Sequence, residues 1–243
     1  FITDITEQKI VENMRNEFVT ITSHQLRTPL TAIKWFCSIL ANGDVGDLTH
    51  DQASCLREIV ESNERMIQLV NDLLLVSRIE RNIPLVLDKD PVDISKIVHE
   101  CVQEFSTLIE KNTVHIAVSS PEEQPLFIKA DLVKIKEAIR KLLHNAIVYS
   151  FTQGTIDVVV KRIDTEVAIS FRDRGIGIAL KEQKHLFEKF FRGDEARLKE
   201  PGGNGLGLFI VKSYIEAHKG KISFTSRAKR GSTFTVILPL VRK

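Results

Sequence analysis

The segment SHQLRTPL, residues 23–30, places a histidine and a threonine at helical spacing. Thr28 follows His24 by four residues, so both side chains share one face of an expected helix. An imidazole is largely neutral at pH 7, and its free ring nitrogen offers a lone pair to an electrophilic phosphorus atom. His24 is therefore a candidate phosphoryl acceptor, with a solvated surface histidine as the alternative.

A second candidate site is DRGIGI, residues 173–178, which follows a predicted strand. A buried carboxylate at the end of a strand can accept a hydrogen bond from an exocyclic amine, which makes Asp173 a candidate reader of adenine. Gly175 and Gly177 would let the backbone approach a flat ring. Taken alone, this pattern is as typical of a plain turn.

A third candidate is PGGNGLGLFIVK, residues 201–212, in which a glycine cluster opens an apolar helix. The free N–H groups and the positive dipole end of a helix favour phosphate. A P-loop is excluded because the Gly-Lys-Ser/Thr ending is missing, and a Rossmann fingerprint is disfavoured because no strand precedes the cluster. We expect a flexible lid that contacts phosphates through Gly203, Gly205, Leu206 and Gly207, with a helix preceded by a loose loop as the alternative.

Two long amphipathic helices are predicted to position the histidine. Apolar residues recur at steps of three and four over residues 7–42, and Pro29 is expected to kink this first helix. Turn-forming residues follow, and Thr49 is expected to cap a second helix that ends near Arg81. Two helices alone cannot bury such stripes, so we expect a dimeric four-helix bundle, with a core inside one chain as the alternative. In the first helix the stripe residues are Val11, Met14, Phe18 and Ile21 and, after a jump of five, Leu26, Leu30, Ile33, Cys37 and Leu40. In the second helix they are Leu56, Ile59, Met66, Val70, Leu73 and Ser77, interrupted by Asn63.

After the helical hairpin, short β-rich runs alternate with helical stretches, which indicates an α/β sandwich and an α+β protein overall. The predicted strands are residues 114–118, 155–162, 166–172, 221–225 and 232–238. The change of pattern near residues 82–91 predicts domains at 13–82 and 83–243, preceded by a short segment at 1–12.

Composition narrows the function classes. The 34 Lys plus Arg residues against 32 Asp plus Glu leave a net charge of +2, too balanced to indicate a nucleic-acid partner. The odd number of widely spaced cysteines fits neither a disulfide framework nor a CxxC metal site, which favours a reducing cytoplasm. We expect no membrane contact by this fragment, because no apolar run reaches the roughly 18 residues of a membrane span. Any sensor or membrane anchor would lie before Phe1.

The string SHQLRTPL resembles the H box of histidine kinases, and residues 13–80 resemble that family's dimerisation and phosphotransfer domain. The resemblance implies that His24 is phosphorylated and that Thr28 positions water for removing phosphate from a response regulator. The family usually has Glu or Asp after the histidine, where this chain has Gln25. Glutamine can hold the ring by a hydrogen bond but cannot take its proton, so the sequence predicts slower autophosphorylation.

The second half resembles the ATP-binding domain of histidine kinases, a fold shared with gyrase, the heat-shock 90 chaperones and mismatch-repair ATPases. The segments that carry the resemblance are HNAIVYS, DRGIGI, FEKFFR, GGNGLGL and RGSTFTVILP, in that order. It implies that Asn145 ligates Mg²⁺, that Tyr149 packs beside ATP, and that Arg192 faces the terminal phosphate. Phe190 would help to anchor the lid.

Two positions depart from the pattern of this ATP site. The family often has Asn four residues before the Mg²⁺ ligand and Lys three residues after it, where this chain has Lys141 and Val148. Lys141 lies one helical turn before Asn145, so its side chain could reach phosphate or repel Mg²⁺. The sequence therefore leaves open whether these two departures weaken nucleotide binding.

The combined prediction is an ATP-dependent protein-histidine kinase that passes phosphate from His24 to an aspartate of a response regulator. The opening FITDITEQ resembles the end of a PAS sensor domain, followed by a signal helix. Three alternatives stay open: a sensor that docks a regulator without phosphotransfer, a protein that acts mainly as a phosphatase of its partner, and a chaperone-type or topoisomerase-type ATPase. The H-box helix argues against the last.

Overall fold

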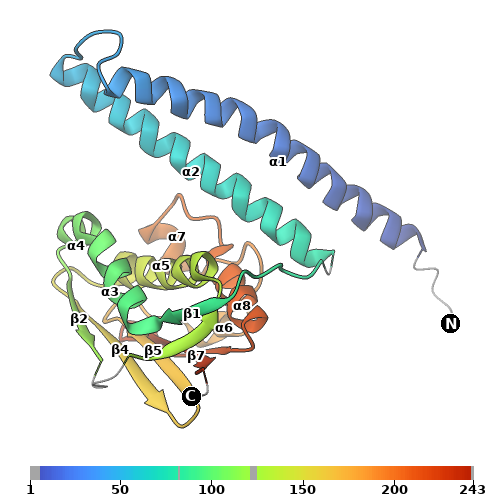
Figure 1. Ribbon diagram of the computed structural model, residues 1–243, viewed down its shortest axis with the longest axis vertical. Helices are drawn as coiled ribbons and strands as arrows, with labels where there is room; N and C mark the ends of the chain where they lie inside the picture. Colours follow the sequence, from blue (N-terminus) through green and yellow to red (C-terminus); the bar gives the residue numbers. More distant parts are fainter. Residues whose placement is uncertain (1–5, 82, 121–124, 242–243) are drawn as a thin grey trace. The chain divides into compact units, whose positions relative to one another are not determined.

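The computed structural model describes residues 6–81, 83–120 and 125–241, and side chains from Ile21 onward (Figure 1). The chain divides into two compact units, Phe1–Pro84 and Leu85–Lys243. The PAS-like prediction for residues 1–8 falls mostly outside the described residues, and from Thr6 the chain is helical. Among the helices of the described residues, none is both long enough and apolar enough to cross a membrane.

The first unit is an antiparallel helical hairpin of α1, Thr6–Ala41, and α2, His50–Glu80. Both helices were predicted, and α1 continues through Pro29. Thr49 caps α2 as expected: its hydroxyl accepts from the Gln52 N–H at 3.3 Å, and the Gln52 side chain accepts from the Thr49 N–H at 2.9 Å. This capping box satisfies donors that a helix start otherwise leaves without partners.

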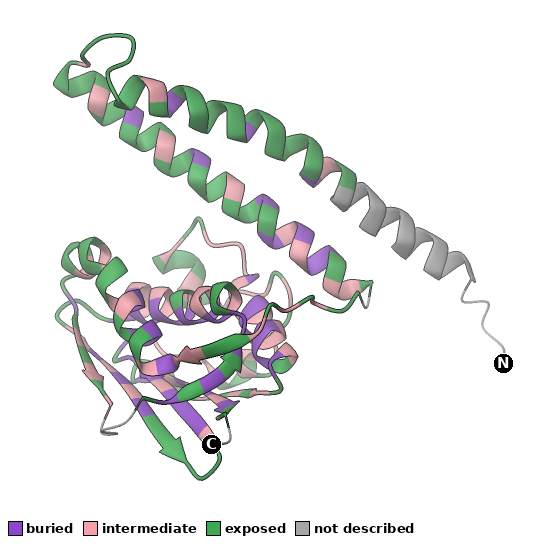
Figure 2. Cartoon of the chain, viewed as in Figure 1, coloured by how far each residue is buried: buried purple, intermediate pink, exposed green. Residues whose placement is uncertain are grey.

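The hairpin buries only part of its predicted stripe (Figure 2). Leu30, Val70 and Leu74 form a small core between the helices. Asn63 is also buried there, and its amide donates to the Leu30 carbonyl at 3.0 Å, while its Oδ1 has no hydrogen-bond partner among the described residues. Several predicted stripe residues stay exposed on the single chain: Leu26, Ile33, Leu40, Ile59 and Met66.

The second unit is a two-layer α/β sandwich, as predicted. Its main sheet has the strand order β2-β4-β5-β7-β6, in which only β2 and β4 pair in parallel. The five strands lie at the predicted positions: β2 His115–Ser119, β4 Thr155–Ile163, β5 Glu166–Arg172, β6 Lys221–Arg227 and β7 Gly231–Pro239. A small antiparallel sheet of β1, Asp90–Asp93, and β3, Phe127–Ala130, was not predicted.

Three longer helices cover one face of the main sheet: α3 Ile94–Glu104, α5 Leu132–Tyr149 and α8 Gly207–Ala217 (Figure 1). Shorter helices are α4 Ser106–Asn112, α6 Leu180–Gln183 and α7 Asp194–Lys199. Alternate residues of β4, such as Ile156 and Val158, are fully buried, and so are Leu143 and Ile147 of α5. The buried faces of β4 and α5, which the sequence periodicities predict, therefore pack into one core. The end of α5 lies beside the loop after β5.

Candidate functional site

His24 lies on the exposed side of α1, together with Gln25 and Thr28. The neighbouring side chains of Ser23 and Leu30 are buried, which fixes the face that points toward α2. The His24 side chain is therefore accessible to solvent in the single chain. Its role and those of Gln25 and Thr28 stay predictions.

Polar contacts tie α1 to α2 on the C-terminal side of His24. The Arg27 guanidinium donates to Asn71 Oδ1 at 2.8 Å, and Lys34 Nζ lies 3.2 Å from Glu64 Oε1. Exposed contacts of this kind contribute little free energy each, but they orient the two helices. The turn that carries His24 is thus positioned by the buried side chains that face α2 and by the polar contacts that follow it along α1.

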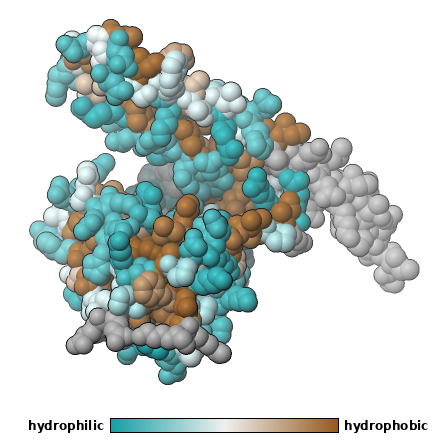
Figure 3. All heavy atoms as spheres, in the orientation of Figure 1, coloured by the Kyte–Doolittle hydropathy of each residue, from teal (hydrophilic) through white to brown (hydrophobic). Residues whose placement is uncertain are grey.

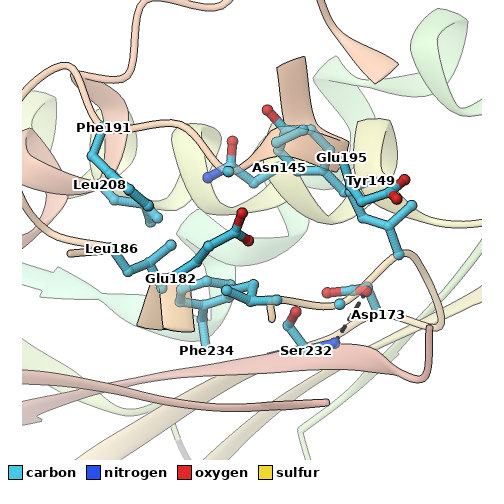
Figure 4. Close-up of a pocket in the computed structure, with 15 residues that line it drawn as sticks. Asn145, Tyr149, Asp173, Glu182, Leu186, Phe191, Glu195, Leu208, Ser232 and Phe234 are labelled. Carbon is cyan, nitrogen blue, oxygen red and sulfur yellow. Dashed lines mark hydrogen bonds between the residues drawn. The ribbon is translucent and has the colours of Figure 1, made fainter. Parts of the chain in front are cut away.

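A pocket that is partly open to solvent lies between α5, the loop after β5 and the segment after α6 (Figure 4). Four predicted nucleotide-binding residues line it: Asn145, Tyr149, Asp173 and Gly177. The other lining residues are Ile176, Ile178, Glu182, Leu186, Phe191, Gly193, Glu195, Ala196, Leu208, Ser232 and Phe234.

Asp173 is a buried acid at the base of this pocket, with 6% of its surface exposed. Its Oδ1 accepts from the Ser232 N–H at 3.2 Å, a bond drawn in Figure 4. Burial raises the pKa of Asp173 from 3.8 to about 6, although backbone hydrogen bonds from Ser232 and Gly175 oppose the rise. At pH 7 the carboxylate is mostly ionised and can accept a further hydrogen bond from a ligand.

The glycines of DRGIGI allow close contacts with protein backbone. A Cβ at Gly175 would lie 1.9 Å from the Tyr149 carbonyl oxygen, and one at Gly177 would lie 2.1 Å from that of Arg227. Ile176 N–H donates to the Tyr149 carbonyl at 3.1 Å. The predicted reason for these glycines was approach to a flat ring, and the structure adds a reason within the protein: Gly175 lies against the end of α5 and Gly177 against the end of β6.

Asn145 and Tyr149 project from the last turns of α5 into the pocket (Figure 4). The Tyr149 hydroxyl donates to Glu200 Oε2 at 3.0 Å, and Glu200 Oε1 lies 3.9 Å from His144 Nε2. Burial, followed by the charge of Glu200, raises the pKa of Tyr149 to about 12, so the phenol keeps its proton. Burial also lowers the pKa of His144, which keeps this imidazole neutral near pH 7.

The segment from Gly193 to Leu206, called the lid below, contains α7 and the glycine cluster. Gly205 has φ +71°, and a Cβ there would lie 2.7 Å from the Phe190 carbonyl carbon. The Phe190 N–H donates to the Gly205 carbonyl at 3.0 Å, while the Phe190 ring is half exposed. Leu206 is fully buried and Gly207 begins α8, so this end of the lid is anchored by packing.

Arg192 donates to backbone carbonyls of the lid. Its Nη1 reaches the carbonyls of Pro201 at 3.2 Å and Gly203 at 2.8 Å, and its Nη2 reaches those of Ala196 at 2.8 Å and Glu200. Arg192 does not line the pocket as found. Its predicted contact with a terminal phosphate would therefore require these bonds to be exchanged.

Lys141 also lies outside the pocket lining, with its Nζ 3.6 Å from Glu137 Oε1 on the same helix. No contact between Lys141 and the pocket therefore supports the prediction that Lys141 takes the place of the lysine that is missing at position 148. The remaining predicted residues that do not line the pocket are Gly175, Phe190, Gly203, Gly205, Leu206 and Gly207.

Two pocket carboxylates were not predicted from the sequence, Glu182 and Glu195. Glu182 Oε1 accepts from the Asp194 N–H at 3.0 Å, so α6 caps the first turn of α7. Neither residue stands in a motif, since each belongs to an ordinary charged helical stretch. The path of the lid brings Glu195 into the same pocket lining as Tyr149 and Asn145 (Figure 4).

The donor set of the pocket fits Mg²⁺ only with help from a ligand. Asn145 offers a neutral amide oxygen, and Glu195 is a carboxylate in the lining of the same pocket. Among the described residues no group of three or more His, Cys, Asp or Glu side chains could hold a metal by itself. Mg²⁺ commonly binds one or two protein oxygens together with substrate phosphates, which matches this arrangement.

Two family models match the chain. Residues 14–82 match the His Kinase A (phospho-acceptor) domain, and residues 130–242 match the histidine kinase-, DNA gyrase B- and HSP90-like ATPase. The sensor protein kinase WalK of Staphylococcus epidermidis is 33% identical over 97% of this chain, which spans 38% of that relative. The sensor-like histidine kinase SenX3 of Mycobacterium tuberculosis is 33% identical over 98% of this chain, which spans 57% of that relative.

Solved structures show the same similarity. Full-length ShkA, determined in complex with AMPPNP, superimposes with a TM-score of 0.75 and 25% identity over 93% of this chain and 46% of that one. The histidine kinase AdeS of Acinetobacter baumannii matches with a TM-score of 0.61 over 90% of this chain and 98% of that one, at 24% identity. The second likeness supports the fold alone.

Proposed function

The chain belongs to the two-component sensor histidine kinases, and on that premise we propose that it transfers the γ-phosphate of Mg-ATP to His24 and then to an aspartate of a response regulator. The observation that carries the proposal is the pairing, in one chain, of an exposed H-box histidine with a pocket that contains a buried acceptor, Asp173. Each half alone would suit other functions.

The residues of this chain would act mainly by positioning, because phosphoryl transfer depends on alignment and charge neutralisation. The Asp173 carboxylate would accept from the adenine amine, and Tyr149 would pack beside the base. The Asn145 amide oxygen would hold Mg²⁺, which supplies charge neutralisation at the phosphates when bound. Arg192 would contribute its guanidinium after leaving the lid carbonyls.

His24 would take the phosphoryl group on a neutral ring nitrogen. Gln25 can accept a hydrogen bond from the other ring N–H and so fix the tautomer, but it cannot remove that proton. We therefore propose slow autophosphorylation. Thr28, exposed one turn later, would position water when phosphate is removed from the regulator.

We further propose that the hairpin dimerises into a four-helix bundle. Large apolar side chains lie exposed along the single hairpin, and Figure 3 shows apolar surface between its polar side chains. Among them are Ile33, Ile59 and Met66 at stripe positions, with 40%, 51% and 47% of their surface exposed. Pairing two hairpins would remove this area from water, a favourable change of about 25 cal/mol per Å².

The test is incubation of the purified chain with γ-labelled ATP and Mg²⁺ beside the His24→Ala variant. An acid-labile, base-stable label that is lost in the variant supports the kinase. Label that persists in His24→Ala would mean that another residue is modified and would refute the assignment of His24.

A second candidate function is a regulator phosphatase with weak kinase activity. It is favoured by Gln25 beside His24 and by the absence of Lys and Arg among the described pocket-lining residues. This function predicts little phospho-His24 but rapid loss of phosphate from a phosphorylated receiver domain. The Thr28→Ala variant should then lose most of that activity, whereas a docking-only sensor would show none in either form.

A further inference from the structure

The lid, in the conformation described, disfavours the phosphates that it is proposed to bind. Its helix α7 packs against α5, and its residues Glu195 and Ala196 line the pocket. The lining contains three acids, Asp173, Glu182 and Glu195, and no lysine or arginine among the residues that the structure places there. These three acidic groups, of which Asp173 is buried and Glu195 is exposed to solvent, oppose the entry of a polyanion.

Arg192, the arginine of the FEKFFR motif, is held by the lid itself. Its two terminal nitrogens donate to four lid carbonyls, those of Ala196, Glu200, Pro201 and Gly203. A carbonyl is a neutral acceptor, and a phosphate oxygen forms the stronger, charge-assisted bond with a guanidinium. A nucleotide could therefore compete for Arg192 once the lid is free to move.

Glu200 connects this clamp to α5. Its backbone carbonyl accepts from Arg192, while its side chain accepts the Tyr149 hydroxyl at 3.0 Å. Its second carboxylate oxygen lies 3.9 Å from His144. One lid residue thus joins Arg192 to the helix that carries the predicted Mg²⁺ ligand Asn145.

We propose that Glu200 is a positioning residue. It latches the lid onto Tyr149 and keeps Arg192 on the lid carbonyls until a nucleotide displaces the lid. The inference rests on the proposed nucleotide-binding function. It predicts that part of the nucleotide's binding free energy is used to break the latch, so that removing the Glu200 carboxylate strengthens binding.

Hydrogen exchange of the lid amides, measured on the purified chain without nucleotide, tests the latch directly. Glu200→Ala should speed exchange in the lid roughly tenfold, since a hydrogen bond to a charged group is lost. Glu188→Ala is the control, because Glu188 is an exposed acid just before the lid that pairs with His185. Tyr149→Phe should match Glu200→Ala, and the double variant should show no further increase. Unchanged lid exchange in Glu200→Ala would overturn the latch.

Titration with Mg²⁺ and AMPPNP then separates a latch from a merely structural role. Glu200→Ala should bind the analogue more tightly, by up to about tenfold, whereas structural damage would weaken binding. Weaker binding by Glu200→Ala would overturn the proposal. If neither wild type nor variant binds the analogue, the proposed kinase function fails, and the exchange experiment still decides whether Glu200 holds the lid.

Discussion

Replacing Asp173 with asparagine is expected to stabilise the second unit while weakening nucleotide binding. The carboxyl is 6% exposed, and its pKa is raised from 3.8 to about 6, chiefly by burial. A shift of about two units corresponds to about 3 kcal/mol that the ionised folded state loses relative to the unfolded chain. Asparagine keeps an oxygen for the Ser232 N–H, but its amide protons need partners, so we expect a net gain of roughly 1–2 kcal/mol.

The sign of the pH dependence follows from the raised pKa. Between about pH 4 and 6 the folded protein binds the proton of Asp173 more strongly than the unfolded chain does, so this group's contribution to stability falls as pH rises through that window. The asparagine variant lacks this loss. Its advantage over wild type should be largest above pH 7 and should shrink toward pH 4.5.

Urea unfolding of both proteins at pH 7.5 and pH 4.5 measures this difference, with Asp157→Asn on half-buried β4 as the control. Titration of the same variant with AMPPNP should show affinity reduced at least tenfold, because an amide donor would face the adenine amine. A variant that is less stable than wild type at pH 7.5, or a stability advantage that does not change with pH, would refute the conclusion that burial raises the pKa of Asp173.

Three further substitutions test other parts of the protein. Gln25→Glu should raise the rate of autophosphorylation, by up to about 10² if proton removal limits the step, and an unchanged rate in a labelled-ATP time course would contradict the role given to this position. Asn63→Leu should stabilise the hairpin by roughly 1 kcal/mol, because the buried Oδ1 has no partner, and a lower urea midpoint would show that the bond to Leu30 matters more. Gly205→Ala should lower nucleotide affinity and the thermal midpoint together, since φ is +71° and a Cβ would lie 2.7 Å from the Phe190 carbonyl carbon; an unchanged midpoint would mean that the lid backbone adjusts freely.

The periodic elements could be predicted because their signals are local. The capping box at Thr49 and the alternating residues of β4 and β5 each determine an element from a few neighbouring residues. β1 and β3 were missed because four residues carry too little periodicity, and their pairing joins positions far apart in the chain. The length of a strand and the separation in sequence between paired strands, more than amino-acid composition, decided which strands could be predicted.

The site was predictable where a motif holds its own geometry. Asp173 and Asn145 line the pocket because a strand end and a helix face fix their directions. Glu195 and Glu200 were missed because their positions depend on the path of a loop, and no pattern in the sequence specifies that path. Arg192 was predicted from its motif to face a phosphate, which stays a prediction; its partners in the lid are backbone carbonyls, which any sequence offers.

The continuity of α1 through Pro29 has a mechanical consequence. Proline has no N–H, so the carbonyl of Gln25, four residues earlier, cannot receive the usual helical hydrogen bond. The turn that begins one residue after His24 therefore resists bending less than the rest of the helix. A torque applied at the N-terminal end of α1 would concentrate its deformation there, changing the direction of the imidazole while the capped and packed part of the hairpin stays in register.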